Sequence, residues 1–429
     1  MSEKKINDPG SNSFKRISNY IEMFNFPRLP GSKGEERAID LTVNIFNEIG
    51  FENDQVIKES FEFSNFYSTV LIRLLIIFTL TIVLSLMLMV YISHFSLFLI
   101  IAISIFVILL IVKDNKHPEE NTFWNRHFGR YLSSSNVYVK IPNLKTARES
   151  RGNIILSAHI DSKSQPFTSY GRGKVYRTWI YSGILFGIFY PIYTIYLYSS
   201  YSVVGITVSS NMPRIISIEL VLWILFFLIF ISNLLLLMLK SQNKSTGALD
   251  NASGMAIVFE LSAFFKDNPL NNYNLWFCQF SAEEMGTMGS RFFLNNHENQ
   301  FIKGKVFLIN SDAISDARDE NNERIEYIKS TKRFPLRQGS PIISQYLEQA
   351  AKEEGLSIYG YHSTFGIHFD SLPFRLRGFD AIDIHTKSTK KYTHSKEDSP
   401  DKINPKTLHD AVMIIRKAVL MLDSDCHKK

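Results

Sequence analysis

Five short segments of the sequence carry the imidazole and carboxylate side chains from which a metal centre is built. They read HID (159–161), GALDNASG (247–254), EE (283–284), NSD (310–312) and YTHS (392–395). Four of them come after a short apolar run that predicts a β-strand, and the GALDNASG segment opens a predicted helix. Singly, each has an ordinary explanation as a core histidine, a helix cap or a solvated acidic pair. Together they are expected at one edge of a sheet, where the carboxyl ends of parallel strands meet.

Two histidines and several carboxylates, with no thiolate, suit a pair of divalent ions such as zinc. A carboxylate has two oxygens and can bridge two such ions, which lie about 3.5–4 Å apart in hydrolytic sites. The adjacent Glu283 and Glu284 then take separate roles. One holds a metal, and its neighbour is the general base for the water that the two metals activate.

The elements that must position these residues are predicted from hydrophobic periodicity. The helices are expected over 35–49, 252–265, 341–354 and 405–422, and the strands over 136–141, 153–158, 274–280, 306–309 and 381–384. Short apolar strands that alternate with helices predict an α/β fold with a mostly parallel mixed sheet sandwiched by helices.

Four apolar runs interrupt this pattern, over residues 74–91, 95–112, 179–198 and 215–239. Each approaches the roughly 20 residues that an α-helix needs to cross a bilayer. Short connectors join them in pairs, so the sequence predicts two transmembrane hairpins, over 69–113 and 178–240. The α/β domain is then divided into segments 1–68, 114–177 and 241–429. Glu219, in the fourth run, is expected to reach the membrane interface.

The orientation of the hairpins follows from the positive-inside rule. Their connectors hold Ser93-His94 and the single basic residue Arg214, whereas lysines and arginines flank the outer ends. Both termini and the α/β domain are therefore expected in the cytoplasm of a multi-pass protein, most simply one of the cell membrane. Only two cysteines occur, Cys278 and Cys426, which argues against a disulfide framework. The net charge of +6 is accounted for by these flanks and does not indicate nucleic-acid binding.

The motifs HID, GALDNASG, SAEEMG, NSD and YTHSKEDSPDKI, in this order and on these elements, resemble the di-zinc aminopeptidases of peptidase family M28. The stretch RLPGS (28–32) resembles the amino-terminal entry of that family. The resemblance implies two co-catalytic zinc ions, replaceable by other divalent ions. It assigns His159, Asp250 and Asp312 to one ion. It assigns Asp250, Glu284 and His394 to the other, with Asp250 as the bridge.

The resemblance also implies that Glu283 is the catalytic base and that Asp161 orients the ligand His159. One departure is FDSLPF (369–374), where Ser371 stands at a position that is often histidine in the family. Asp370 in this stretch is expected as a residue behind the ligands or near the substrate. Three nearby histidines are expected to be structural: His362, His368 and His385.

The resemblance implies a zinc aminopeptidase that removes amino-terminal residues from peptides, and the apolar runs place it in a membrane, which is a departure from the family. Because the second hairpin begins soon after Asp161 and returns just before Asp250, the substrates are expected to include hydrophobic or membrane-derived peptides; the alternative is that the hairpins only tether the domain. Its partners would be the peptide substrate and the lipid bilayer. Two alternatives stay open on the same scaffold. One is a glutaminyl-cyclase-like transferase with a single zinc, and the other is a non-catalytic membrane scaffold.

Overall fold

The structure, a computed structural model, describes residues 9–92, 95–114, 117–145, 152–203, 215–315, 324–331, 337–363 and 368–425. These residues form two compact units. The first contains the described residues up to Asn65, then Arg130–Thr168, and those from Ser241 onward; the second contains Phe66–Gly129 and Ser169–Lys240. The second unit thus includes 114–129 and 169–177, which the sequence assigned to the α/β domain. Ser93, His94, Lys116, Arg214 and Cys426 lie outside the described residues.

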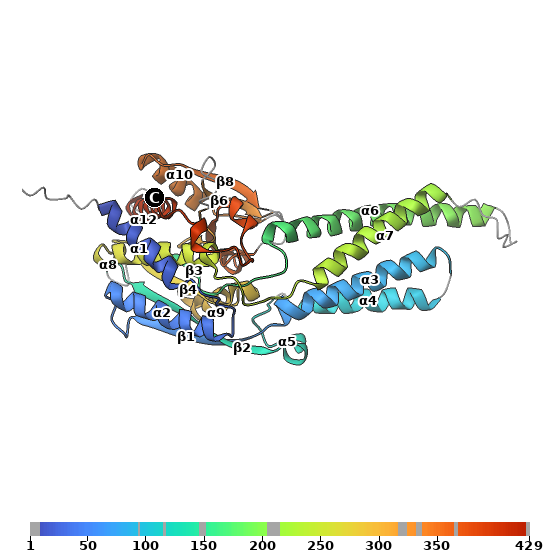
Figure 1. The fold of residues 1–429 in the computed structure, drawn as a ribbon, viewed down its shortest axis with the longest axis horizontal. Helices are drawn as coiled ribbons and strands as arrows, with labels where there is room; N and C mark the ends of the chain where they lie inside the picture. Colours follow the sequence, from blue (N-terminus) through green and yellow to red (C-terminus); the bar gives the residue numbers. More distant parts are fainter. Residues whose placement is uncertain are drawn as a thin grey trace, which may run out of the picture. The chain divides into compact units, whose positions relative to one another are not determined.

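A nine-stranded sheet in the described residues forms the centre of the first unit, in the order β1-β2-β4-β3-β5-β9-β6-β7 with β8 paired to β6 (Figure 1). The strands are β1 (Val56–Ser64), β2 (Tyr131–Ile141), β3 (Gly152–His159), β4 (Tyr273–Phe280), β5 (Val306–Ser311), β6 (Ile325–Thr331), β7 (Arg337–Gln338), β8 (Ile358–Ser363) and β9 (Asp380–Ile384). The central strands β4, β3, β5 and β9 are parallel. The neighbours β2 and β6 join this block antiparallel. The predicted mostly parallel mixed sheet is confirmed.

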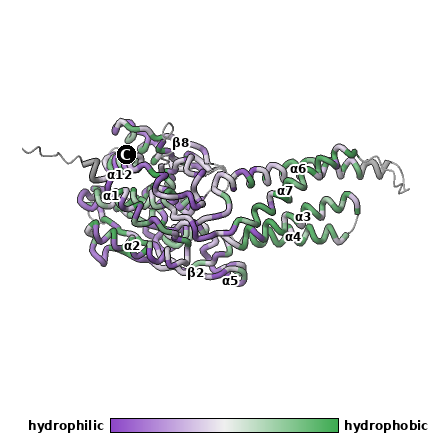
Figure 2. Tube along the Cα trace, viewed as in Figure 1, coloured by the Kyte–Doolittle hydropathy of each residue, from purple (hydrophilic) through white to green (hydrophobic). Residues whose placement is uncertain are grey.

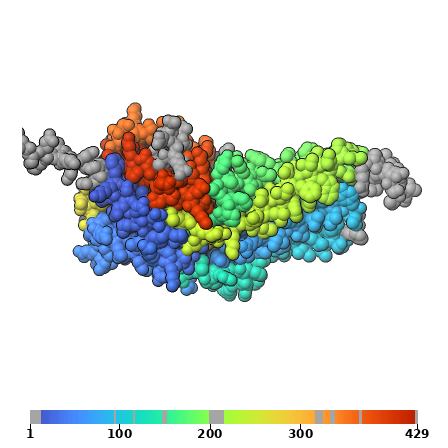
Figure 3. Space-filling view, in the orientation of Figure 1, coloured from blue at the N-terminus to red at the C-terminus, as the bar shows by residue number. Residues whose placement is uncertain are grey.

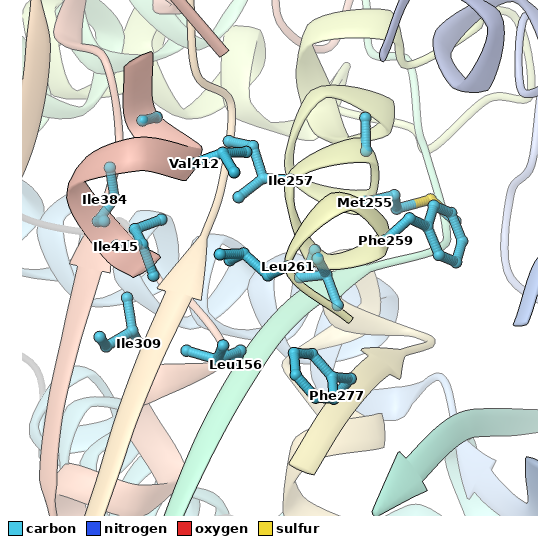
Figure 4. Close-up of a cluster of buried hydrophobic side chains, with 14 of the residues drawn as sticks. Leu156, Met255, Ile257, Phe259, Leu261, Phe277, Ile309, Ile384, Val412 and Ile415 are labelled. Carbon is cyan, nitrogen blue, oxygen red and sulfur yellow. The ribbon is translucent and has the colours of Figure 1, made fainter. Parts of the chain in front are cut away.

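Helices cover both faces of this sheet. They are α1 (Pro9–Met23), α2 (Lys33–Ile49), α8 (Ser253–Asp267), α9 (Met288–His297), α10 (Pro341–Glu353), α11 (Ser371–Leu376) and α12 (Pro405–Ser424). Successive strand residues point to opposite faces, so Leu156 of β3 lies in the larger core while Ile155 lies in the smaller one. Figure 4 shows Ile257 and Leu261 of α8 in the larger core. Leu156 of β3, Ile309 of β5 and Ile415 of α12 belong to the same core. The smaller core holds Phe293 of α9 and Phe374 of α11.

The boundaries of α2 follow the signals that its sequence carries. The Ser32 hydroxyl accepts a hydrogen bond from the Glu35 N–H at 3.3 Å and caps the first turn. The helix ends at Gly50, whose φ of 103° lies in the left-handed region that favours glycine.

Four long helices and one short helix form the second unit. The long ones are α3 (Leu71–Met89), α4 (Phe95–Asp114), α6 (Ser169–Val203) and α7 (Ile216–Leu237), and the short one is α5 (Phe123–Phe128). By length and composition, all four long helices are apolar enough to cross a membrane. Figure 2 shows their hydrophobic colouring along their length, and Figure 3 shows α7 alongside the hairpin of α3 and α4. Phe186, Leu225 and Ile229 belong to a buried cluster of this unit.

A polar cluster joins α6 and α7 to the turn that follows α3. Glu219 of α7 accepts hydrogen bonds from the hydroxyls of Tyr193 in α6 and of Tyr91, the latter at 3.4 Å. The indole N–H of Trp223 donates to the Tyr91 hydroxyl at 2.9 Å. The sequence placed Glu219 at the interface, and the structure adds that its carboxylate connects the two hairpins.

Candidate metal centre

The structure brings together all five residues that the sequence nominated as metal ligands. His159 is the last residue of β3, and Asp312 directly follows β5. Glu284 lies in the turn after β4, where it follows Glu283. Asp250 lies in the turn that leads into α8, and His394 lies between β9 and α12. The predicted convergence at the carboxyl edge of the parallel strands is confirmed.

The ligand atoms form two sets that share one residue. The first set is His159, Asp250 and Asp312, and the second is Asp250, Glu284 and His394. Within each set, the ligand atoms lie within 4.8 Å of one another and all three residues are buried. His159 Nε2 is 3.1 Å from Asp250 Oδ1, and His394 Nε2 is 3.3 Å from Asp250 Oδ2. The two oxygens of Asp250 therefore face different sets, as a bridging carboxylate requires.

The residues fit two divalent cations. His159 Nε2 and Glu284 Oε1 are buried polar atoms without a hydrogen-bond partner. A buried polar atom without a partner costs free energy, and both atoms point into the ligand sets, where a cation would satisfy them. The donors are imidazole nitrogens and carboxylate oxygens, which are ligands that zinc accepts. The assignment of these five residues as ligands remains a prediction.

The electrostatics of the sets favour cations. Burial lowers the pKa of His159, but the carboxylates of Asp161, Asp250 and Asp312 reverse this and hold the pKa well above its ordinary value. Burial likewise raises the pKa of Glu284, but the positive charges of His394 and Lys163 outweigh burial and lower it to about 2. The buried carboxylates thus stabilise positive charge on the neighbouring side chains.

Glu283 differs from its neighbour. Burial raises its pKa, and although the charge of His159 opposes this, the pKa lies well above the ordinary value, with the charge of Glu284 adding to the rise. A carboxyl group with a raised pKa holds a proton more readily than an ordinary carboxyl group, which suits a general base. The pKa values of the adjacent glutamates shift in opposite directions, and their assignment to separate roles remains a prediction.

Asp161 fixes the turn that carries the two glutamates. Its carboxylate accepts hydrogen bonds from the main-chain N–H groups of Glu283 and Glu284, both at 3.0 Å. His159 Nδ1 hydrogen-bonds to the main-chain oxygen of Asp161 at 3.0 Å, whereas the Asp161 carboxylate is 3.6 Å away. Asp161 therefore orients His159 mainly through its main-chain oxygen. Its carboxylate holds the turn of Glu283 and Glu284 instead.

Asp398, which sequence reasoning did not single out, holds the turn of Asp250 in the same way. Its carboxylate accepts the N–H groups of Leu249 at 2.6 Å and Asp250 at 3.3 Å. Burial raises its pKa to about 7. Because Asp398 lies four residues after His394, it joins the segments of two predicted ligands. Its position within the YTHSKEDSPDKI motif is the sequence feature that could have identified it as a residue of the site.

Arg28 is a second residue that the sequence did not nominate for the site. Its side chain is fully buried, and it donates to the main-chain oxygens of Ile160 at 2.7 Å and Gly247 at 3.1 Å. It also donates to the main-chain oxygens of Phe24 and Thr246. Burial lowers its pKa to about 10. Arg28 thereby connects the segments of His159 and Asp250.

Glu35 supports the strand that leads to Glu283. Its carboxyl group accepts hydrogen bonds from the hydroxyls of Ser134 at 2.6 Å and Ser281 at 2.5 Å, and from the Gly31 N–H at 2.5 Å. Burial raises the pKa of Glu35 to about 7, although the two serine hydroxyls lower it in part.

Asp370 and Ser371 occupy the stretch that departs from the family pattern. Asp370 is fully buried, burial raises its pKa to about 7, and the charges of His159 and Asp161 act on it. Its role behind the ligands or near the substrate remains a prediction. Ser371 donates to Asp383 at 2.5 Å, within a buried network that includes Arg375.

The neighbouring histidines have structural contacts. His385 Nδ1 bonds to the main-chain oxygen of Asp312 at 3.0 Å, and His362 Nδ1 lies 2.7 Å from the Ser330 hydroxyl. His368 is half-buried in the described part of the chain.

Comparison with known proteins gives a family match and several fold matches. Residues 238–419 match the family model described as peptidase family M28. Aminopeptidase YwaD of Bacillus subtilis (strain 168) is 26% identical over 180 residues, which are 41% of this chain and 37% of that protein. The matching region thus spans little more than a third of that curated relative.

Three solved structures share the fold. An aminopeptidase from Aneurinibacillus sp. strain AM-1 has a TM-score of 0.53 at 13% identity, over 95% of this chain and 93% of that chain. The zinc aminopeptidase BSAP from Bacillus subtilis has a TM-score of 0.52 at 12% sequence identity, over 99% of this chain and 97% of that chain. An Acidobacteriales bacterium glutaminyl cyclase gives 0.52 at 15%, over 99% of each chain.

Proposed function

We propose that the chain is a metallo-aminopeptidase of peptidase family M28, whose family model matches residues 238–419. One observation carries the proposal. Two complete sets of buried ligand atoms share Asp250, and Glu283, a carboxyl group of raised pKa, directly precedes the ligand Glu284. Two divalent cations bound there would supply Lewis-acid polarisation of the scissile carbonyl and would lower the pKa of a water molecule.

The chain's own residues supply the proton transfer. Glu283 takes the proton of the attacking water and later gives it to the leaving amine, as a general base and then a general acid. Asp161 holds the N–H groups of the glutamate turn and so fixes where the Glu283 carboxylate lies. Asp398 and Arg28 do the same for the turn that carries Asp250.

The number of ligand atoms favours the aminopeptidase over a cyclase with a single zinc. Both sets of buried ligand atoms are complete, and His159 and Asp312 are both present in the first set. The glutaminyl cyclase shares the fold at a similar TM-score, so the fold does not separate the two activities.

The membrane assignment is part of the proposal. Four helices of sufficient length and apolarity support an integral, multi-pass protein. Lysines and arginines flank the outer ends of the hairpins, which supports cytoplasmic termini and a cytoplasmic peptidase domain in the cell membrane. A site anchored in this way would act on hydrophobic or membrane-derived peptides.

Metal analysis of the purified protein, combined with a panel of aminoacyl chromogenic substrates, tests this function. We expect about two equivalents of metal and chelator-sensitive release of the chromophore. A peptide with an amino-terminal glutamine in the same panel distinguishes the glutaminyl-cyclase activity from the aminopeptidase activity. Release of ammonia from it without cleavage of any aminoacyl substrate would replace the aminopeptidase by a cyclase.

A further inference from the structure

Lys163, in the segment that follows β3, reaches one of the predicted metal ligands. Its ammonium nitrogen Nζ is 2.6 Å from Glu284 Oε2 and 3.2 Å from the main-chain oxygen of Glu284. The Lys163 side chain is 12% exposed and that of Glu284 is 3% exposed. Solvent and salt therefore screen this ion pair much less than an ion pair on the surface.

The two oxygens of Glu284 have different surroundings. Oε1 lies 3.0 Å from His394 Nε2 and has no hydrogen-bond partner, so it is available to the second ligand set. Oε2 is occupied by Lys163. A cation in the second set would therefore share the charge of Glu284 with an ammonium group, and that ammonium group would also repel it.

The first ligand set has different neighbours. Among the described residues, the ion-pair contacts of Asp312 are with imidazoles, His159 at 3.5 Å and His385 at 3.8 Å. Imidazole becomes neutral when it coordinates a metal, whereas an ammonium group keeps its positive charge. The two sets are therefore unequal in the charge that surrounds them.

We infer that Lys163 makes the two cation sites unequal, because it holds Glu284 to one coordinating oxygen and weakens the second set. The first set, with His159 and Asp312, then fills first, and the second fills only at a higher concentration of free divalent cation. This inference rests on the proposed two-cation function. It makes the supply of divalent cations a regulator of the site, through a positioning residue outside the ligand sets.

A cobalt titration of the metal-free protein measures both sites without an activity assay. The absorption of Co²⁺ reports occupancy as each set fills, and equilibrium dialysis gives the stoichiometry. For the wild type we expect two dissociation constants that differ by about tenfold or more, which is the scale on which residues behind metal ligands act. In Lys163→Met the second constant should tighten by about tenfold, while the first stays unchanged.

Two further variants make the comparison specific. Lys163→Arg keeps the positive charge and should keep the two constants apart. Lys244→Met removes the same charge from an exposed side chain of the first unit, and it should titrate like the wild type. If Lys163→Met does not fold, Lys163→Gln provides the same comparison.

The outcomes separate this inference from the function on which it rests. If Lys163→Met and Lys244→Met each bind two cations with the same dissociation constant for the second cation, the inference is overturned and the two-cation function stays intact. A wild type that holds a single cation, beside a Lys163→Met variant that takes up a second, would support the inference and contradict the two-cation function.

Discussion

Glu283 is the residue whose replacement separates chemistry from metal binding. Glu283→Gln keeps the size of the side chain but cannot accept a proton, so kcat should fall by about a hundredfold or more, the usual contribution of a general base. The metal content should stay that of the wild type, because Glu283 belongs to neither ligand set. Steady-state kinetics and metal analysis of the same preparation check both statements. Activity within a few-fold of the wild type would remove Glu283 from its role.

Glu35 should make stability depend on pH. Its pKa is raised to about 7 in the folded chain, against about 4.3 in an unfolded one. Between these values the unfolded state loses its proton while the folded state keeps it. The free energy of unfolding should therefore fall as pH rises through this window, by up to roughly 1.4 kcal/mol per pH unit.

The comparison of Glu35→Gln with the wild type isolates this effect. The Tm of the wild type should decline relative to that of Glu35→Gln between pH 4.5 and 7, a window set by the two pKa values above. Glu36→Gln, an exchange at the exposed neighbouring position, should follow the wild type. Parallel curves for the wild type and Glu35→Gln would show that Glu35 titrates normally.

The sequence predicted the ligand residues because each comes after an apolar strand or opens a helix, where a histidine or a carboxylate stands out. It did not predict the roles of Arg28, Asp398 and Lys163, because their partners lie far away along the chain. Arg28 binds main-chain oxygens 132 and 219 residues away, and Asp398 binds an N–H group 149 residues away. Main-chain N–H and C=O groups are present at almost every residue, so the sequence does not show which of them a distant side chain binds. Only the folded structure identifies these contacts.

At the scale of elements, the hydrogen bond between Tyr193 and Glu219 should stabilise the packing of α6 against α7 within the second hairpin. Tyr193→Phe removes the hydroxyl that donates to Glu219 and keeps the ring. Hydrogen bonds between membrane helices contribute about 0.6 kcal/mol on average and up to roughly 1.7 kcal/mol. The variant should therefore be less stable by about 1 kcal/mol in detergent unfolding.

Tyr181→Phe is the matched control, because that side chain on the same helix is 63% exposed. Equal stability of the Tyr193 and Tyr181 variants would mean that the hydrogen bond between Tyr193 and Glu219 does not stabilise the packing of α6 against α7.

The elements that the sequence predicted are those with a continuous apolar run or a clear helical period. The central strands β3, β4 and β5 are buried on both faces, so they read as apolar runs. Strands β1, β6, β7 and β8 were missed. β1 lies at the edge of the sheet with the exposed residues Ile57, Lys58 and Glu62, and β8 contains Gly360. Their pairing depends on long-range contacts rather than on local composition.

At the scale of the whole molecule, the proposed topology predicts which positions a membrane-impermeant thiol reagent can reach. A cysteine at Lys396, beside His394, should be labelled only after permeabilisation of the cells. Cysteines at Ser93 and Ser209, which lie outside the described residues, should be labelled on intact cells because their connectors are nearly free of basic residues. Labelling of the Lys396 position on intact cells would reverse the orientation.

The central claim is that a two-cation site in this chain removes residues from the amino terminus of peptides. Mass spectrometry of a hydrophobic peptide incubated with the purified protein tests it most directly, using the free peptide and its amino-acetylated counterpart side by side. The account predicts that the free peptide is shortened one residue at a time, that a chelator stops this and zinc restores it, and that the acetylated peptide stays intact. Cleavage of both peptides at internal bonds, or no cleavage by protein that holds two cations, would contradict it.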